Sequence, residues 1–259
     1  MDAESAGRLL DLLAARRGLV AAVGAGGKKS TLYRLAEAHR LVGSASVGLT
    51  CTVTSGAPPK SLIEARLVAA PERLAAELPP LARLHHLVAY AQPSPKPGRL
   101  GGLPGELIAR LHDAGDFTVT LIKADGARMR WIKAPRDDEP VLPEGVATVL
   151  PVISIRALGQ PLDPATAHRI ERVAAVTGAA PGEPLGPIHL ARLLTSTQGA
   201  LQRVGDAVVV PILNMVEDAA GRAAAREVAR LALAASNRFE RVVLTSMIAA
   251  DPVVEVVGR

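Results

Sequence analysis

The chain has 259 residues, of which 49% are hydrophobic and 2% aromatic, and its formal net charge is +5. This length suits one large α/β domain, whose core must be built from aliphatic side chains. A single cysteine excludes an internal disulfide framework and a cysteine-rich zinc site. Because the basic residues are scattered and aromatic residues are few, we expect no nucleic-acid binding.

The N-terminal region indicates where the protein works. It begins with acidic rather than basic residues, and its apolar stretch, residues 19–23, is too short for a signal peptide or a membrane span. The use of one cysteine is also typical of a reducing compartment. We therefore expect a cytoplasmic protein without a membrane partner.

Hydrophobic patterns predict helices that alternate with strands along most of the chain. The predicted helices cover residues 5–17 (ended by Gly18), 29–42, 71–84, 106–114, 164–177, 188–201 and 218–235. The predicted strands cover residues 19–23, 46–53, 62–69, 87–91, 117–122, 147–155, 207–213 and 241–245. For residues 62–69 a helix is the open alternative. This alternation predicts an α/β fold with a mainly parallel, doubly wound sheet, in the three layers of P-loop NTPases. We expect one domain over residues 1–259, with loop insertions near 92–105 and 125–145.

A glycine cluster joins the first strand to the helix after it, in the sequence VAAVGAGGKKST. Backbone N–H groups of such a loop can surround a phosphate at a helix N-terminus. A lysine then neutralises the phosphates, and a Ser or Thr hydroxyl binds Mg²⁺. The loop therefore predicts a site for ATP or GTP with Mg²⁺, formed by Gly24, Ala25, Gly26, Gly27, Lys28, Lys29, Ser30 and Thr31.

The doubled lysine leaves the register of this loop open. The usual pattern is G-x-x-x-x-G-K-[ST]. Aligning Lys29 and Ser30 with its end places Lys28 at the second glycine and Val23 at the first. Aligning Gly27 and Lys28 instead places Lys29 at the hydroxyl position, with Ser30 one residue late. The alternative is an ordinary glycine-rich turn in which both lysines are solvated.

Asp125 follows the predicted strand 117–122 and is the second candidate site residue. An aspartate at such a strand end often binds Mg²⁺ through water in P-loop enzymes, so we expect a metal site of Ser30 and Asp125. Asp125 and Lys29 are the predicted catalytic residues. The alternative is a β-turn, which Asp-Gly favours. Four basic residues come next and indicate either a surface for an anionic ligand or a solvated loop: Arg128, Arg130, Lys133 and Arg136.

Two further residues are candidates for the ligand site. Asn214 ends a predicted strand, and Glu217 follows in Asn-Met-Val-Glu. Many GTP-binding proteins bind guanine with Asn-Lys-x-Asp, but here Met215 replaces the lysine, and Asn214 can instead cap the following helix. His168 lies at the start of the predicted helix 164–177, where it can face the ligand crevice.

Taken in order, five segments resemble the YqeC family: VGAGGKKSTLYRLA, TCTVTS, KADGARMRWIKAPRDDEPVLP, AHRIERV and PILNMVED. The most specific is A-D-G-x-x-x-x-x-K-A-P-x-x-x-E-P-x-x-P, at residues 124–143. The family is grouped with the maturation of molybdenum hydroxylases that carry a labile selenium-containing cofactor. The resemblance implies that Thr50, Thr52 and Thr54 end a strand near the nucleotide. It also places Lys133, Glu139 and Pro140 on family positions whose roles are unassigned.

The resemblance implies a Mg-nucleotide-binding accessory protein for selenium-dependent molybdenum hydroxylases, acting in insertion or modification of the selenium/molybdenum cofactor. Its partners would be a molybdenum hydroxylase or the proteins that handle its cofactor. The family usually has Glu where this chain has Lys123, so the sequence leaves nucleotide hydrolysis open. Two other functions stay open: a small-molecule kinase on a P-loop scaffold, and a non-enzymatic partner-binding scaffold with a degenerate nucleotide site.

Overall fold

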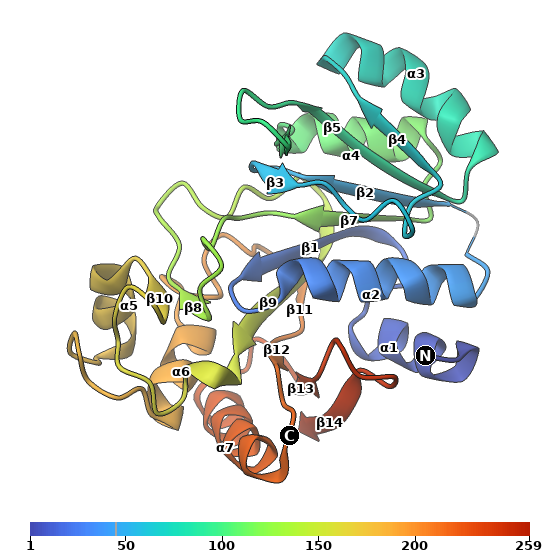
Figure 1. The fold of residues 1–259 in the computed structure, drawn as a ribbon. Helices are drawn as coiled ribbons and strands as arrows, with labels where there is room; N and C mark the ends of the chain where they lie inside the picture. Colours follow the sequence, from blue (N-terminus) through green and yellow to red (C-terminus); the bar gives the residue numbers. More distant parts are fainter. Residues whose placement is uncertain (45) are drawn as a thin grey trace. The chain divides into compact units, whose positions relative to one another are not determined.

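The computed structural model describes residues 1–44 and 46–259. The protein is α/β, with mostly parallel strands and seven α-helices in this described part (Figure 1). It divides into two compact units. Unit 1 comprises Met1–Ala22, Thr31–Gly126 and Val141–Val149, and unit 2 comprises Val23–Ser30, Ala127–Pro140 and Leu150–Arg259. None of the helices described has both the length and the apolar character needed to span a membrane.

Unit 1 contains five parallel strands in the order β1-β7-β2-β5-β4. Their bounds are β1 (Gly18–Gly24), β7 (Val119–Lys123), β2 (Val47–Cys51), β5 (Leu87–Pro93) and β4 (Ala65–Val68). The residues of β2 are all buried, as expected for a parallel strand covered on both faces. In β4 half-buried and exposed residues alternate, which is typical of an edge. Two short strands add antiparallel pairing, β3 (Ser55–Gly56) and β6 (Arg99–Gly101).

The helices of unit 1 are α1 (Ala3–Leu12), α2 (Lys28–Leu41, whose first three residues belong to unit 2), α3 (Pro71–Leu84) and α4 (Gly105–Ala114). The connection through α2 runs from β1 to β2. The connections through α3, from β4 to β5, and through α4, from β5 to β7, run in the opposite direction along the strand order. Because such crossovers are right-handed, α2 covers one face and α3 and α4 the other. Figure 1 shows this arrangement, and α3 packs against α4. The expected double winding is thus present in unit 1.

Unit 2 contains three parallel strands in the order β9-β12-β13, and β14 pairs antiparallel with β13. These strands are β9 (Val146–Ser154, whose first four residues belong to unit 1), β12 (Ile212–Asn214), β13 (Arg241–Thr245) and β14 (Val253–Gly258), and the chain also forms β11 (Val208–Val209). In the register of the sheet Asn214 lies opposite both Ser154 and Thr245. The carboxyl ends of the three strands therefore meet at one edge, where open α/β sheets bind ligands.

Three helices complete unit 2: α5 (Ile170–Thr177), α6 (Pro187–Thr195) and α7 (Ala219–Ala235). They pack in succession, and α7 packs against β13 and β14. A short parallel ladder joins β8 (Ile132–Lys133) to β10 (Ala167–His168). A 3-10 turn, Ile155–Ala157, follows β9.

Several predicted boundaries are wrong for local reasons. The first helix ends at Leu12 rather than at Gly18, because Ala14 has a φ of +48° and Gly18 already begins β1. The helix expected from residue 164 begins only at Ile170, since Arg169 has a φ of +67°. Both residues adopt a left-handed conformation, which interrupts a right-handed helix.

Other differences concern strands. The strand expected over residues 207–213 is split into β11 and β12, and Pro211, which has no N–H to donate, lies between them. The helix expected to reach residue 201 ends at Thr195. The segments expected to be loops at 92–105 and 125–145 contain β6 and β8. The antiparallel strand β14 was not predicted.

Candidate functional site

The glycine loop, residues 24–30, lies in unit 2 and needs glycine at three positions. Gly24, Gly26 and Gly27 have φ values of +86°, +81° and +132°, which L side chains rarely adopt. A Cβ atom on Gly24 would lie 2.4 Å from the carbonyl oxygen of Val152, and one on Gly26 would lie 2.5 Å from Ser154. The glycine cluster is therefore required by the backbone conformation and by the close approach of β9.

The two lysines of the loop differ in their environment. Lys28 is only 5% exposed, and its Nζ donates a hydrogen bond to the carbonyl oxygen of Gly24. Lys29 and Ser30 are exposed. Helix α2 begins at Lys28, so the N–H groups of its first turn face no carbonyl four residues earlier within the helix. Lys28 thus folds back over a loop that ends at the electropositive end of a helix.

Asn214 holds the loop to the ends of the strands. Its side chain is 2% exposed, and its Nδ2 donates to the carbonyl oxygen of Gly26 at 2.9 Å. Its Oδ1 accepts hydrogen bonds from Thr245 Oγ1 at 3.1 Å and from the N–H of Met247 at 3.3 Å. One buried amide therefore connects the loop with the carboxyl ends of β12 and β13.

The alternative that Asn214 caps the next helix is wrong. Asp218 is the N-cap of α7, and its carboxylate accepts a hydrogen bond from the N–H of Gly221 at 2.6 Å. Asn214 precedes this N-cap by four residues, and its side chain bonds Gly26, Thr245 and Met247 instead.

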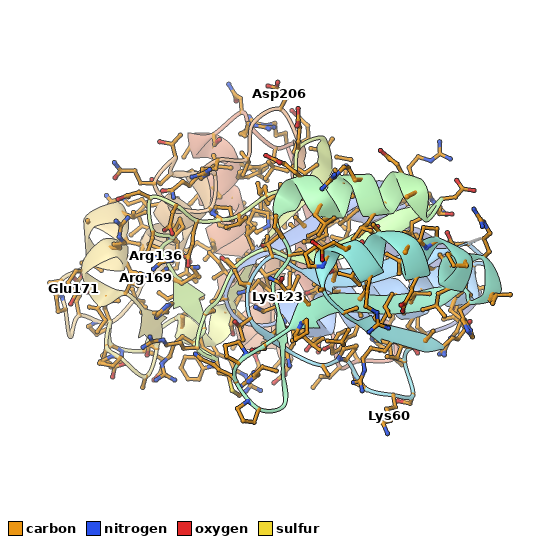
Figure 2. The ribbon with its side chains drawn as sticks, turned by 90° about the horizontal axis from the view of Figure 1, so that it is seen from above. Lys60, Lys123, Arg136, Arg169, Glu171 and Asp206 are labelled. Carbon is orange, nitrogen blue, oxygen red and sulfur yellow. The ribbon has the colours of Figure 1, made fainter. Side chains whose placement is uncertain are left out.

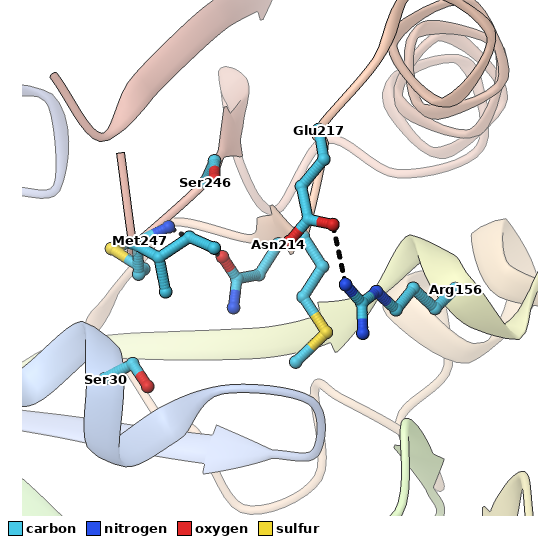
Figure 3. A pocket seen from close by; sticks show the side chains of 8 residues that line it. Ser30, Arg156, Asn214, Glu217, Ser246 and Met247 are labelled. Carbon is cyan, nitrogen blue, oxygen red and sulfur yellow. Dashed lines mark hydrogen bonds and ion pairs between the residues drawn. The ribbon is translucent and has the colours of Figure 1, made fainter. Parts of the chain in front are cut away.

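A pocket of about 200 Å³ lies beside the loop, within unit 2 (Figure 3). Its walls combine methionine and isoleucine side chains with polar ones. They come from Ser30, Arg156, Asn214, Met215, Glu217, Ser246, Met247 and Ile248. On one side Arg156 Nη2 lies 2.6 Å from Glu217 Oε2. Of these residues, Arg156 and the three after β13 were not predicted; the only sequence signal for the latter was their position after a predicted strand.

Several other predicted ligand residues belong to unit 1. Asp125 is 1% exposed and follows β7, and its carbonyl oxygen accepts a hydrogen bond from Lys123 Nζ at 2.8 Å. Thr31 is fully buried in α2. The hydroxyl of Thr52 is buried without a hydrogen-bond acceptor or donor among the residues described. Since Ser30 belongs to unit 2, the expected joint role of Ser30 and Asp125 in binding Mg²⁺ stays a prediction.

The neighbouring threonines have different environments. Thr50 donates its hydroxyl to the carbonyl oxygen of Tyr90 at 2.7 Å, which gives it a role within the sheet. Thr54 is exposed. Their expected position near a nucleotide stays a prediction.

The K-A-P and E-P segment forms a cluster of ion pairs in unit 2. Glu139 accepts from Lys133 at 2.8 Å and from two nitrogens of Arg169 at 2.7 and 2.8 Å. Burial raises the pKa of Glu139, but the hydrogen bonds from Arg169 and Lys133 outweigh burial and lower it to about 2. Arg136, which lies near Arg169 in Figure 2, pairs with Asp138 at 3.0 Å. Of the four basic residues for which the sequence left a ligand surface and a solvated loop open, Lys133 and Arg136 therefore already pair with carboxylates.

His168 lies in β10 and not at a helix start. Burial lowers its pKa to about 4, and the positive charges of Arg169, Lys133 and Arg128 act in the same direction. The imidazole is thus neutral at pH 7. That His168 can face a ligand crevice stays a prediction.

The fold and site define an α/β protein in which a glycine loop before α2 meets the carboxyl ends of parallel strands. The chain belongs to the YqeC family, because the family model described as "YqeC protein" matches residues 20–171. The chain is also 32% identical over 199 residues to the "Uncharacterized protein YqeC" of Escherichia coli (strain K12). That alignment covers 76% of this chain and 75% of the relative. The expected family membership is confirmed.

Proposed function

We propose that this protein binds a magnesium nucleotide through residues 24–30, on a fold of the P-loop NTPase type, with Lys28 as the lysine that contacts the phosphates. The observation that carries the proposal is the position of Lys28. It is buried, and its ammonium group reaches back to Gly24 over a loop with three glycines at positive φ. This places one cation and the start of a helix on the same short loop, an arrangement that favours a polyphosphate.

The residues of the loop would share the work of binding. Lys28 would neutralise the phosphates, and backbone N–H groups at the start of α2 would donate to their oxygens. The exposed hydroxyl of Ser30 is the candidate Mg²⁺ ligand, and the metal would offset the charge of the phosphates. The roles predicted from the sequence for Thr31, Thr52 and Asp125, which belong to unit 1, and for Lys29 as a catalytic residue stay predictions.

A titration with fluorescent ATP and GTP analogues in the presence of Mg²⁺ tests the proposal. Loss of a hydrogen bond to a charged group weakens binding by about 1.5–3 kcal/mol, or about 10- to 150-fold. We therefore expect Lys28→Ala to bind both nucleotides about 10- to 150-fold more weakly than the wild type. The matched control Lys60→Ala removes an equal charge from an exposed position outside the loop and should bind within about threefold of wild type, whereas Lys29→Ala should lose less binding than Lys28→Ala. Thermal melting of each variant checks that the fold is intact.

Two results would contradict the proposal. If Lys28→Ala binds both nucleotides as the wild type does, Lys28 is not the phosphate lysine. If only Lys29→Ala loses binding, the alignment on Lys29 and Ser30 is the correct register. Phosphate release measured in the same samples separates binding from hydrolysis.

We further propose that nucleotide binding serves the maturation of selenium-dependent molybdenum hydroxylases, by insertion or modification of their cofactor. Family membership supports this role. The test is the activity of such a hydroxylase in a host whose copy of this gene is deleted and then replaced by the wild type or by Lys28→Ala. The proposed role requires that hydroxylase activity falls when this gene is deleted. The activity should return with the wild-type gene and not with the Lys28→Ala variant. Unchanged hydroxylase activity after deletion would refute it.

A further inference from the structure

From the pocket of unit 2 we infer that the protein receives a nucleobase there and selects guanine over adenine. This inference rests on the proposed binding of a nucleotide by the adjacent loop.

The pocket lies where the base of a loop-bound nucleotide can reach. Ser30, in the first turn of α2, lines it, and so does Asn214, which donates to the carbonyl oxygen of Gly26 at 2.9 Å. Sites for complete drug-sized ligands occupy about 300–1,000 Å³. At about 200 Å³ this pocket suits one ring system, with the ribose and phosphates outside it along the loop.

The apolar part of the pocket suits a flat aromatic ring. Met215, Met247 and Ile248 contribute to its walls, and thioethers make favourable contacts with ring edges and faces. The Ile248 side chain is 80% exposed, so a bound ring would cover apolar surface that now faces solvent. Met215 is held in place because its sulfur accepts a hydrogen bond from Ser154 Oγ at 3.0 Å.

The polar edge of the pocket distinguishes the two purines. The Watson–Crick edge of guanine carries two adjacent donors, N1–H and the N2 amino group, beside the acceptor O6. A carboxylate accepts two parallel donors, and a guanidinium donates, so Glu217 and Arg156 together match that edge. Adenine presents the acceptor N1 beside its single amino group, and a carboxylate would face that lone pair. This repulsion is the discriminating element.

The pair has room for a base. Arg156 contacts Glu217 through Oε2, and the Arg156 and Glu217 side chains are 50% and 36% exposed. Within the described part of the chain, Glu217 Oε1 takes part in no hydrogen bond. Figure 3 shows this pair on one side of the pocket and Ser30 on another.

The test is calorimetric titration of the full chain with the Mg²⁺ complexes of GTP, ITP, ATP and XTP. The base of ITP lacks the amino group of guanine, whereas XTP carries an oxygen in its place. We expect GTP to bind about 10- to 100-fold more tightly than ATP, with ITP between them. Glu217→Gln should lose most of the preference for GTP over ATP and gain affinity for XTP, because its amide donates to that oxygen. A gain of binding cannot arise from misfolding.

The matched control is Glu227→Gln, at an exposed position of α7, which should leave the order of affinities unchanged. Equal binding of GTP and ATP by the wild type would overturn the inference and leave the proposed function standing. An undiminished preference for GTP in Glu217→Gln would also overturn it. Absence of binding for every nucleotide would refute the proposed function itself, and this inference with it.

Discussion

Replacing Asn214 by alanine tests whether one amide joins the glycine loop to the strand ends. The substitution removes a donor to the carbonyl oxygen of Gly26 and an acceptor for Thr245 and for the N–H of Met247. Asn214 is 2% exposed and Thr245 is fully buried. Water therefore cannot readily replace the lost contacts.

The expected cost follows from the number of contacts. Each hydrogen bond contributes about 1 kcal/mol net, and three are lost, so unfolding free energy should fall by about 3 kcal/mol. Groups left buried without a hydrogen bond add to this cost. If the unfolding free energy falls by about 3 kcal/mol per molar urea, the urea concentration at half unfolding should fall by about 1 M.

Urea denaturation followed by circular dichroism measures the change. Asn237→Ala is the matched control, because Asn237 is exposed and surface substitutions usually change stability by less than about 0.5 kcal/mol. If Asn214→Ala unfolds at the same urea concentration as Asn237→Ala, the amide does not make the three contacts and the reasoning fails.

Two more predictions concern buried titratable groups. Glu139→Gln leaves Lys133 buried without its carboxylate, and should cost about 3–5 kcal/mol at pH 7 in the same urea assay. Because the folded pKa of Glu139 is about 2, below the usual 4.5, its contribution is complete above pH 4.5 and is lost as the pH falls toward 2. The gap between wild type and variant should therefore narrow in acid, and a gap independent of pH would contradict this. Burial raises the pKa of Cys51 to about 11, although the charge of Lys123 acts against this shift. Because the thiolate is the reactive form, a disulfide reagent at pH 8 should label the folded protein slowly. It should label the urea-unfolded protein completely. Rapid labelling of the folded protein would show that Cys51 is accessible.

Part of the structure of the glycine loop could be predicted from the sequence. The spacing of glycines between a buried strand and a helix predicted the loop and the helix N-terminus at its end. The spacing alone fits neither lysine fully, because each alignment departs from the usual pattern at two positions. The two lysines differ in burial, because Lys28 is buried and Lys29 is exposed.

The pocket shows what sequence spacing leaves out. Asn214 was recognised as a candidate because it ends a predicted strand. Ser246, Met247 and Ile248 carry no motif, and they come near Asn214 because β12 and β13 pair in parallel with Asn214 opposite Thr245. Ala14 and Arg169 interrupt two predicted helices by adopting a left-handed conformation. Nothing in the sequence indicated this, because neither residue is a glycine.

The sequence by itself determined the α/β class, the order of most helices and strands, the position of the glycine loop and membership of the YqeC family. These follow from hydrophobic periodicity, glycine usage and motif order, which are local along the chain. Only the tertiary structure decided which lysine covers the loop, what Asn214 connects and which residues line the pocket. Those features depend on strand register and burial, and both are set by contacts between residues far apart in the chain.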